Sequence, residues 1–495
     1  MKIDRIVSYT RCVFCYTIVT VDMRFFGEVY MKNEAVEYRT IEEVLERAKV
    51  AEGKPFKDYD IKNRLASSGN KGGLGQIIEE GLFGYDINSK SEADFFELGV
   101  ELKVTPLKLD KKKRVVAKER LVLNIINYME EYKFTFETSS FWKKNEKLLI
   151  MFYMWKENCE RGDYKIIKSF LHTFSEEDLL IIVRDWETIV AKIRSGKAEE
   201  ISEGDTMYLA ACTKGANSNT TRKQPFSSID AKQRAFSLKP SYITSYARSV
   251  LSNEIQVSLA NADELREKSL EDILQDRFMP YYGLTTKEIC LKLGTEAGIG
   301  KNEIPRLTSL MLGIKGTHLD EIEEFKKANI QFKTIRLEPD GLPKEHMSFE
   351  QINFQRLMED DWEDSQFYEK FEYTKFLFVL FQYDERLSVA KKKNREREPY
   401  LKKVILWNMP EKTVQTEIKD LWEATRKVLQ DGVKFSPAKN GIGVSNNLPG
   451  AKDSEVCHIR PKGLNGNDKV QLPDGQWITK QCYWLNREYV AKIVE

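Results

Sequence analysis

The chain has 495 residues, and its 78 lysines and arginines balance 77 aspartates and glutamates to leave a formal charge of +1. A hydrophobic fraction of 41% beside a charged fraction of 31% excludes a wholly disordered chain, a collagen and a bundle of membrane helices. At about 150 residues per domain, the length predicts two to four domains. Near-neutrality argues against a nucleic-acid partner only if the charge is evenly spread, because phosphate binding needs a local excess of lysine and arginine.

The cysteines and histidines do not form a recognisable metal or disulfide pattern. Seven scattered cysteines fit a reducing compartment. Cys12 and Cys15 form a C-x-x-C pair, but the sequence has no second such pair to complete a four-ligand site. The four histidines lack zinc-finger spacing, so any metal site must use carboxylates. The apolar run at 12–21 is about half of the ~20 residues that span a bilayer, and we expect no membrane partner. Residues 1–34 are predicted to be an N-terminal extension of unassigned role.

Local patterns in the first half predict a mixture of helices and strands. Thr40 caps a helix that runs to Val50, and a glycine-rich loop leads to a second helix that ends at Gly84. Residues 99–106 alternate apolar and polar side chains, which predicts a half-buried strand. Further strands are predicted at 134–138 and 148–155, and helices over 165–200.

The second half repeats the first. Five segments of the second half resemble five of the first in the same order, four of them at an offset of about 230 residues. The matches pair 71–84 with 301–313, 99–107 with 329–337, 136–141 with 362–367, 148–153 with 376–381, and 212–217 with 459–465. A shared order is harder to explain by chance than any single match. We therefore predict two divergent copies of one α/β domain, at 35–255 and 286–495, with a connecting region at 256–285.

The first copy contains a constellation of carboxylates and a lysine. Asp94 precedes Glu101 by seven residues, and Lys103 follows Glu101 by two, so the latter two side chains share one face of a strand. Mg²⁺ prefers oxygen ligands, which Asp94, Glu101 and the Leu102 carbonyl could supply, with Glu79 as a further candidate. Lys103 could then orient or deprotonate an attacking water, which predicts phosphodiester hydrolysis. The spacing alone more often marks an ordinary exposed strand.

The flanking sequence makes the interpretation more specific. The segments KGGLGQIIE, ADFFELGVELKVTPL and FETSSFWKK resemble the MutH-like branch of the PD-(D/E)xK nucleases. Longer stretches resemble the GATC-cutting type II restriction endonucleases of that branch: 118–128, 208–217, 231–239, 362–368 and 457–461. This resemblance covers nearly everything after residue 35. It implies a mixed central sheet flanked by helices, and Mg²⁺-dependent cleavage of double-stranded DNA at GATC that leaves 5′-phosphate and 3′-hydroxyl ends.

The resemblance also assigns roles to residues. It makes Glu79, Asp94 and Glu101 the metal site and Lys103 the catalytic lysine. Lys144 matches a further basic residue of the active site, with the adjacent Lys143 as the alternative register. No proline precedes Asp94, unlike in the wider superfamily, but the carboxylate that a metal needs is present.

The second copy differs at the corresponding positions. Glu324 and Lys333 stand for Asp94 and Lys103, but Gln331 replaces Glu101, and Thr308 or Ser309 falls opposite Glu79. A neutral amide is a poor ligand for a hard dication. We therefore predict a catalytically inactive second copy that binds DNA or acts allosterically, so that one chain supplies the pseudo-twofold symmetry that other nucleases obtain by dimerising.

Basic residues concentrate in the first copy. Residues 105–120 and 206–250 carry net charges of about +5 and +6, whereas acidic runs lie at 320–324 and 359–364. Such runs neutralise phosphates, although a charge run is often no more than a solvated surface. The resemblance implies base recognition by Arg460-Pro-Lys462 and by its counterpart Thr213-Lys214-Gly215. The predicted DNA-binding residues are Lys214, Gly215, Asn217, Arg234, Arg460 and Lys462.

Two other functions compete with restriction. A MutH-like repair nickase would use the same chemistry, but that class is a single short domain. A non-catalytic DNA-binding protein would not be expected to keep Glu79, Asp94, Glu101 and Lys103 intact. We expect a bacterial cytoplasmic protein that is monomeric in solution and pseudo-dimeric in architecture, with dimerisation on DNA as an alternative.

Overall fold

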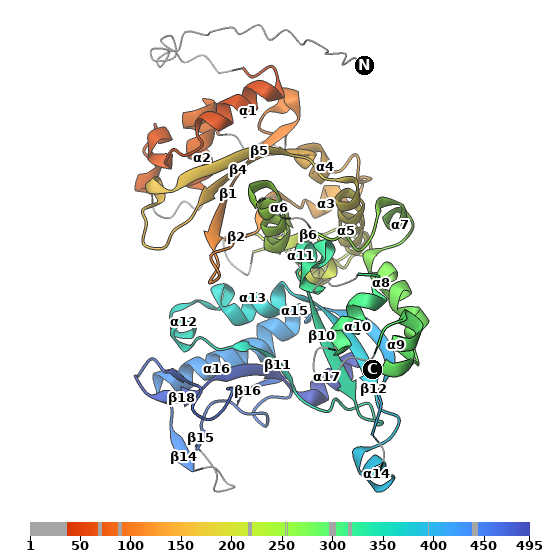
Figure 1. Ribbon diagram of the computed structural model, residues 1–495. Helices are drawn as coiled ribbons and strands as arrows, with labels where there is room; N and C mark the ends of the chain where they lie inside the picture. The colour runs from red at the N-terminus through yellow and green to blue at the C-terminus, as the bar shows by residue number, and fades with distance from the viewer. Residues whose placement is uncertain are drawn as a thin grey trace, which may run out of the picture.

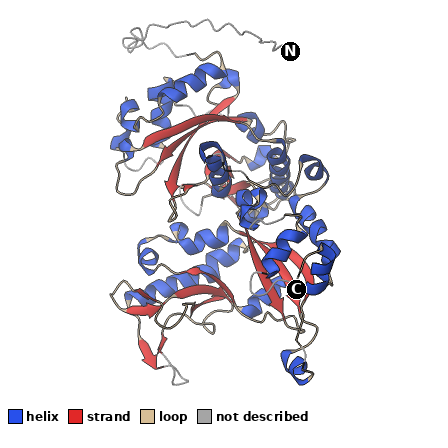
Figure 2. Ribbon diagram, viewed as in Figure 1, coloured by secondary structure: helices blue, strands red, loops and turns tan. Residues whose placement is uncertain are grey.

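The computed structural model describes residues 37–67, 72–87, 92–215, 220–252, 254, 256–296, 303–314, 319–394, 396–437 and 444–495. The predicted extension at 1–34 and the predicted DNA-binding residue Asn217 lie outside the described residues. Two α/β units follow one another along the chain, the first above the second in Figure 1. Figure 2 shows sheets and flanking helices in both units, which confirms the mixed α/β class. No helix in these ranges is long and apolar enough to cross a membrane.

The first unit contains two sheets. Its central sheet has the order β2-β1-β4-β5, in which β1 and β4 are parallel; the strands are β1 (Val100–Leu109), β2 (Val115–Ala117), β4 (Lys147–Met154) and β5 (Lys165–His172). The second sheet has the order β3-β9-β6, with β3 (Leu121–Ile125), β6 (Leu209–Thr213) and β9 (Arg234–Leu238), beside the short pair β7 (Thr221–Arg222) and β8 (Ala231–Lys232). The helices are α1 (Ile41–Val50), α2 (Gly73–Ile77) with its π-helical continuation η4 (Ile78–Phe83), α3 (Tyr128–Glu131), α4 (Ser140–Asn145), α5 (Glu176–Arg194) and α6 (Pro240–Ser252).

The second unit repeats this plan. Its sheets have the orders β10-β12-β13 and β11-β19-β16, with β10 and β12 parallel; the strands are β10 (Ile330–Leu337), β11 (Met347–Gln351), β12 (Lys375–Gln382), β13 (Tyr400–Trp407), β16 (Cys457–Pro461) and β19 (Gln481–Leu485). Two hairpins project from it: β14 (Phe435–Pro437) with β15 (Val444–Asn446), and β17 (Lys469–Gln471) with β18 (Trp477–Thr479). The remaining helices are α7 (Ala262–Glu267), α8 (Leu270–Phe278), α9 (Thr286–Leu293), α10 (Glu303–Met311), α11 (Glu323–Ala328), α12 (Phe354–Glu359), α13 (Gln366–Glu372), α14 (Leu387–Lys392), α15 (Glu411–Thr413), α16 (Lys419–Gln430) and α17 (Arg487–Val494).

Strand register aligns the two copies. Val100 at the start of β1 pairs with Lys147 of β4, and Ile330 at the start of β10 pairs with Lys375 of β12. The next residues along the two strands, Glu101 and Gln331, therefore occupy equivalent positions. The recognition segments align differently from our expectation. Thr213, the last residue of β6, pairs with Arg234, and Pro461, the last residue of β16, pairs with Gln481. Thr213 and Pro461 are therefore equivalent. Residues 460–462 correspond to 212–214, and the predicted correspondence to 213–215 is wrong by one residue.

Local predictions met mixed outcomes. The helix capped by Thr40 is confirmed, and so is the helix that ends at Gly84. Residues 134–138 are a turn and not a strand, because the Thr138 hydroxyl bonds the Thr135 backbone and offers it an alternative to a sheet ladder. Residues 165–172 form β5 and not a helix, because they pair with the buried strand β4.

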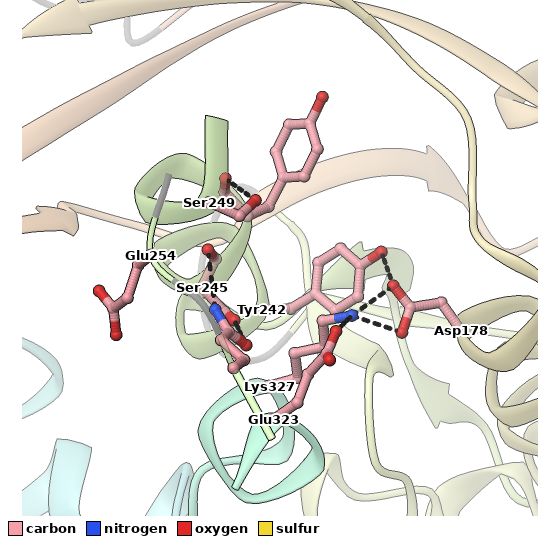
Figure 3. Close-up of a pocket in the computed structure, with 9 residues that line it drawn as sticks. Asp178, Tyr242, Ser245, Ser249, Glu254, Glu323 and Lys327 are labelled. Atoms are coloured by element: carbon pink, nitrogen blue, oxygen red, sulfur yellow. Dashed lines mark hydrogen bonds and ion pairs between the residues drawn. The ribbon is translucent and has the colours of Figure 1, made fainter. Parts of the chain in front are cut away.

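The two copies share a core. One contiguous buried cluster extends from Leu107 in the first copy to Val404 in the second. Figure 3 shows a junction beside it, where Lys327 of α11 reaches Asp178 of α5. Lys327 Nζ lies 2.7 Å from both Asp178 carboxylate oxygens, and the Tyr242 hydroxyl donates to Asp178 at 2.8 Å. A cavity of about 170 Å³ lies against this ion pair, and the residues that line it include none of the predicted active-site residues.

Candidate active site

Glu79 lies on η4, which close packing holds in place. A Cβ at Gly81 would lie 1.8 Å from the Tyr59 carbonyl oxygen, so a glycine is required for this turn to approach the Tyr59 backbone. The adjacent carboxylates have opposite surroundings. Glu80 is buried against Arg64, at 2.5 Å and 2.8 Å, and this pairing lowers the pKa of Glu80 to about 2. Burial and the negative Asp94 and Glu101 raise the pKa of Glu79 to about 7.

Asp94 is tied to the start of β1. The Leu102 backbone N–H donates to Asp94 Oδ2 at 2.9 Å, and the Asp94 backbone N–H donates to Glu101 Oε2 at 3.2 Å. These bonds bring the two carboxylates to the same end of the strand. Burial and the charge of Glu101 raise the pKa of Asp94 to about 6. Glu101 is 3% exposed, so its charge is largely removed from water.

Two lysines converge on Glu101. Lys103 Nζ donates to Glu101 Oε1 at 2.8 Å and lies 3.4 Å from the Leu123 carbonyl oxygen on β3. Lys144 Nζ lies 3.5 Å from the same Glu101 oxygen. Lys143 points elsewhere, with its Nζ 5.4 Å from the centre of the Phe134 ring. The geometry therefore selects Lys144 over Lys143 as the second lysine of this cluster.

The donor set suits a hard divalent cation. Three carboxylates face two ammonium groups, and burial together with the neighbouring carboxylates raises the pKa values of Glu79 and Asp94, so a further positive charge here would favour their ionised forms. In the described ranges, no group of three His, Cys, Asp or Glu side chains already stands at metal-binding spacing. Glu101 Oε1 is instead engaged by Lys103. Cation binding would therefore need side-chain movement, and the ligand role of Leu102 stays a prediction.

Most of the predicted DNA-binding side chains that the structure describes lie on the surface. Lys214 and Gly215 are exposed after β6, and Gln233 holds this segment through bonds of 2.8 Å and 2.5 Å to the Lys214 backbone. In the second copy, Arg460 and Lys462 are exposed, and their charged groups lie 5.5 Å and 5.6 Å from the Trp484 ring centre. Both segments lie at the carboxyl ends of equivalent strands, β6 and β16, with Arg460 still within its strand.

Arg234 is an exception among the predicted DNA-binding residues. It is 1% exposed, and its guanidinium donates to the Ala211 carbonyl at 2.7 Å and to Glu411 of the second copy at 2.8 Å. The same Glu411 pairs with Lys232 at 2.5 Å. In this structure Arg234 therefore joins the two copies and is not available to DNA. A count of charges along the sequence could not reveal this, because the partner is 177 residues away.

The equivalent site in the second copy has an amide, Gln331, at the position of Glu101, but it keeps two lysines. Lys333 Nζ donates to the Ser348 carbonyl at 3.2 Å, much as Lys103 does to β3. Glu324 turns away, because its carboxylate accepts backbone bonds from Leu259 and Ala260 at 2.9–3.1 Å. Sequence reasoning missed Lys370, which bonds Gln331 Oε1 at 2.5 Å. Its place five residues after the N-cap Ser365 matches that of Lys144 after Ser139.

The architecture and the acidic cluster with its two lysines define a PD-(D/E)xK-type nuclease fold present in two copies. The family of the DNA mismatch repair enzyme MutH matches residues 83–185 and again 317–420. The type II restriction enzyme Sau3AI of Staphylococcus aureus is 35% identical over 497 residues, covering 92% of this chain and 99% of that enzyme. MutH proteins of Shewanella woodyi and Pasteurella multocida are each 27% identical, over 37% and 36% of this chain and 78% and 81% of their own lengths.

The chain therefore belongs to the MutH-like nuclease family and groups with its type II restriction enzymes, since similarity to the restriction enzyme extends over both copies. The predicted duplication is confirmed by the two family matches. Membership makes the chain a site-specific deoxyribonuclease, and the interpretation as a non-catalytic DNA-binding protein is not supported.

Proposed function

We propose that the first copy hydrolyses both strands of double-stranded DNA at GATC, using Mg²⁺, and that the second copy binds DNA without cleaving it. The observation that supports this most directly is that Glu79, Asp94, Glu101, Lys103 and Lys144 converge in the first copy, whereas the equivalent of Glu101 in the second is an amide. We also assign the protein to the bacterial cytoplasm, as a monomer that is pseudo-dimeric in architecture.

Each active-site residue has a role in this proposal. Glu79, Asp94 and Glu101, with the Leu102 carbonyl, would hold Mg²⁺, which when bound supplies charge neutralisation at the phosphate and a more acidic water. Lys103 gives up its bond to Glu101 and orients or deprotonates the attacking water. Lys144 places a second positive charge beside the phosphate oxygens, where negative charge grows as the bond breaks.

Surface residues would position the duplex. Lys214 and Gly215, with Asn217, would contact DNA beside the catalytic copy, and Arg460 and Lys462 would do so in the second. Arginine and lysine can each bind the O6 and N7 atoms of guanine, which suits a target that contains a G·C pair at each end. The exposure of Lys214, Arg460 and Lys462 at the ends of equivalent strands supports this proposal.

A plasmid assay tests the function. Unmethylated plasmid incubated with Mg²⁺ should yield GATC fragments, and EDTA should prevent this. Open circles without linear fragments would instead indicate a nickase, and no cleavage under any condition would contradict the proposal. A parallel incubation with adenine-methylated plasmid measures sensitivity to the modification.

A further inference from the structure

Three lysines converge in the second copy at the place where the first copy gathers carboxylates. Lys333 donates to the Ser348 carbonyl at 3.2 Å, and Lys462 donates to the Ser348 hydroxyl at 2.6 Å. Lys370 approaches from α13 and bonds both Gln331, at 2.5 Å, and Glu350. All three ammonium groups therefore lie along the first four residues of β11, from three different elements.

The balance of charge is reversed between the copies. In the first copy, three carboxylates outnumber Lys103 and Lys144. In the second, Lys333, Lys370 and Lys462 face the carboxylate of Glu350, whose side chain is 55% exposed. Glu324 cannot compensate, because the connecting segment binds its carboxylate. The side chains of the first site thus carry an excess of negative charge, and those of the second an excess of positive charge.

We propose that Lys333, Lys370 and Lys462 form a phosphate-binding site that holds a backbone phosphodiester of duplex DNA without a divalent cation. This rests on the proposed function, because it specifies how the second copy engages DNA. It goes beyond that function by giving the remains of the active site a ligand.

The surroundings of the cluster suit a phosphate. Lys333 is largely buried and the Lys370 side chain is 10% exposed, whereas Lys462 is exposed at the rim, so the cluster opens towards solvent on one side. The Gln331 amide and the Ser348 hydroxyl each retain a hydrogen-bond donor. Burial and the neighbouring Lys370 lower the pKa of Lys333 to about 8, so a bound anion would relieve the repulsion between these two lysines.

The test measures metal-free binding by the full chain. Fluorescence anisotropy of a labelled GATC duplex in EDTA, over a series of salt concentrations, gives the affinity and its salt dependence. Lys370→Gln should weaken binding about tenfold and reduce the slope of log affinity against log salt by about one. Lys391→Gln removes an exposed charge on α14 and is the matched control, which should match the wild type.

A second variant protects the test against misfolding. Gln331→Glu removes no lysine and preserves shape, but it places a carboxylate between Lys333 and Lys370. It should weaken metal-free binding as Lys370→Gln does. Unchanged binding by both variants would overturn the phosphate site.

Further measurements distinguish failure of the phosphate site from failure of the proposed DNA-binding role of the second copy. If Arg460→Ala weakens binding while Lys370→Gln and Gln331→Glu do not, the second copy binds DNA and the phosphate site is wrong. If none of the three has an effect, the DNA-binding role of the second copy fails as well. Inorganic phosphate identifies the source of the anion in a thermal-shift assay: stabilisation that Lys370→Gln abolishes, with duplex binding unaltered, would assign the site to free phosphate and contradict the DNA assignment.

Discussion

The two copies share their strands and differ in what gathers at the start of β1 and of β10. In the first, a loop tied to β1 presents Asp94 beside Glu101. In the second, helix α11 carries Glu324 towards the connecting segment, and Gln331 stands in the strand. Both copies keep two lysines at this position. The comparison teaches that the two copies differ in which carboxylates reach this position, while two lysines are present there in both.

The largest expected effect comes from making the first copy resemble the second. Glu101→Gln should reduce cleavage by at least about 10²-fold, because it removes a charged oxygen ligand and leaves Lys103 and Lys144 facing an amide. Single-turnover cleavage of a plasmid in Mg²⁺ measures this. Binding of a GATC duplex in EDTA should be retained, and equal loss of binding and cleavage would contradict the assignment.

The next prediction is that the equivalent lysines Lys103 and Lys333 differ in their effects on cleavage. Lys103→Gln should abolish most cleavage, since Lys103 contacts the proposed metal ligand at 2.8 Å. Lys333→Gln should leave saturating single-turnover cleavage within about tenfold of wild type, because its copy has no acidic site. If both variants lost cleavage to the same extent, the interpretation of the second copy as inactive would fail.

The junction between the copies should respond to a single substitution. Glu411→Ala leaves the Arg234 guanidinium buried and unpaired, which should lower the free energy of unfolding by about 3 kcal/mol. Urea denaturation followed by fluorescence measures this loss. Lys232→Ala is the control, and because Lys232 is 41% exposed, it should cost about 1 kcal/mol or less. Equal effects would contradict a buried role for Arg234.

The smallest expected effect is a dependence of stability on pH. The pKa of Glu79 is raised from 4.5 to about 7 in the folded chain, so its ionisation is unfavourable there. Its contribution to stability is present below pH 4.5 and is lost as pH rises through about 7. In EDTA at pH 8, Glu79→Gln should therefore raise the Tm by about 1–2 °C, or about 1 kcal/mol.

Two controls sharpen that prediction. Below pH 4.5 the Glu79→Gln and wild-type melting curves should coincide, because both side chains are then neutral. Added Mg²⁺ should stabilise the wild type more than the variant at pH 8. A variant that melts lower than the wild type at every pH would show that Glu79 contributes packing and not unfavourable charge.

Much of this organisation could be predicted from sequence, for physical reasons. The alternation over 99–106 and the spacing of Asp94, Glu101 and Lys103 depend on local geometry, and the repeat in the sequence aligns Glu101 with Gln331 as the strand register does. Lys144 could not be separated from Lys143 by sequence, because the choice depends on which face of α4 meets β1. Residues 134–138 were misassigned because threonine hydroxyls compete with strand pairing.

Long-range pairing explains the other failures. Arg234 lies in a basic stretch of the sequence, which is typical of a DNA contact, but Glu411 of the other copy neutralises its charge. Arg120 likewise pairs with Glu203 at 2.6 Å and lies over Tyr373. A net charge of +1 and two basic stretches could not show which cations are free for phosphates, because that depends on partners brought close by folding.

The shared core of the two copies has a consequence when the protein is present at low concentration. A dimeric nuclease assembles by mass action and loses its second half when diluted. Here the buried cluster from Leu107 to Val404 belongs to one polypeptide, so the local concentration of one copy around the other does not depend on how many molecules are made. The two copies therefore stay together at any concentration of the protein, however few molecules a cell holds.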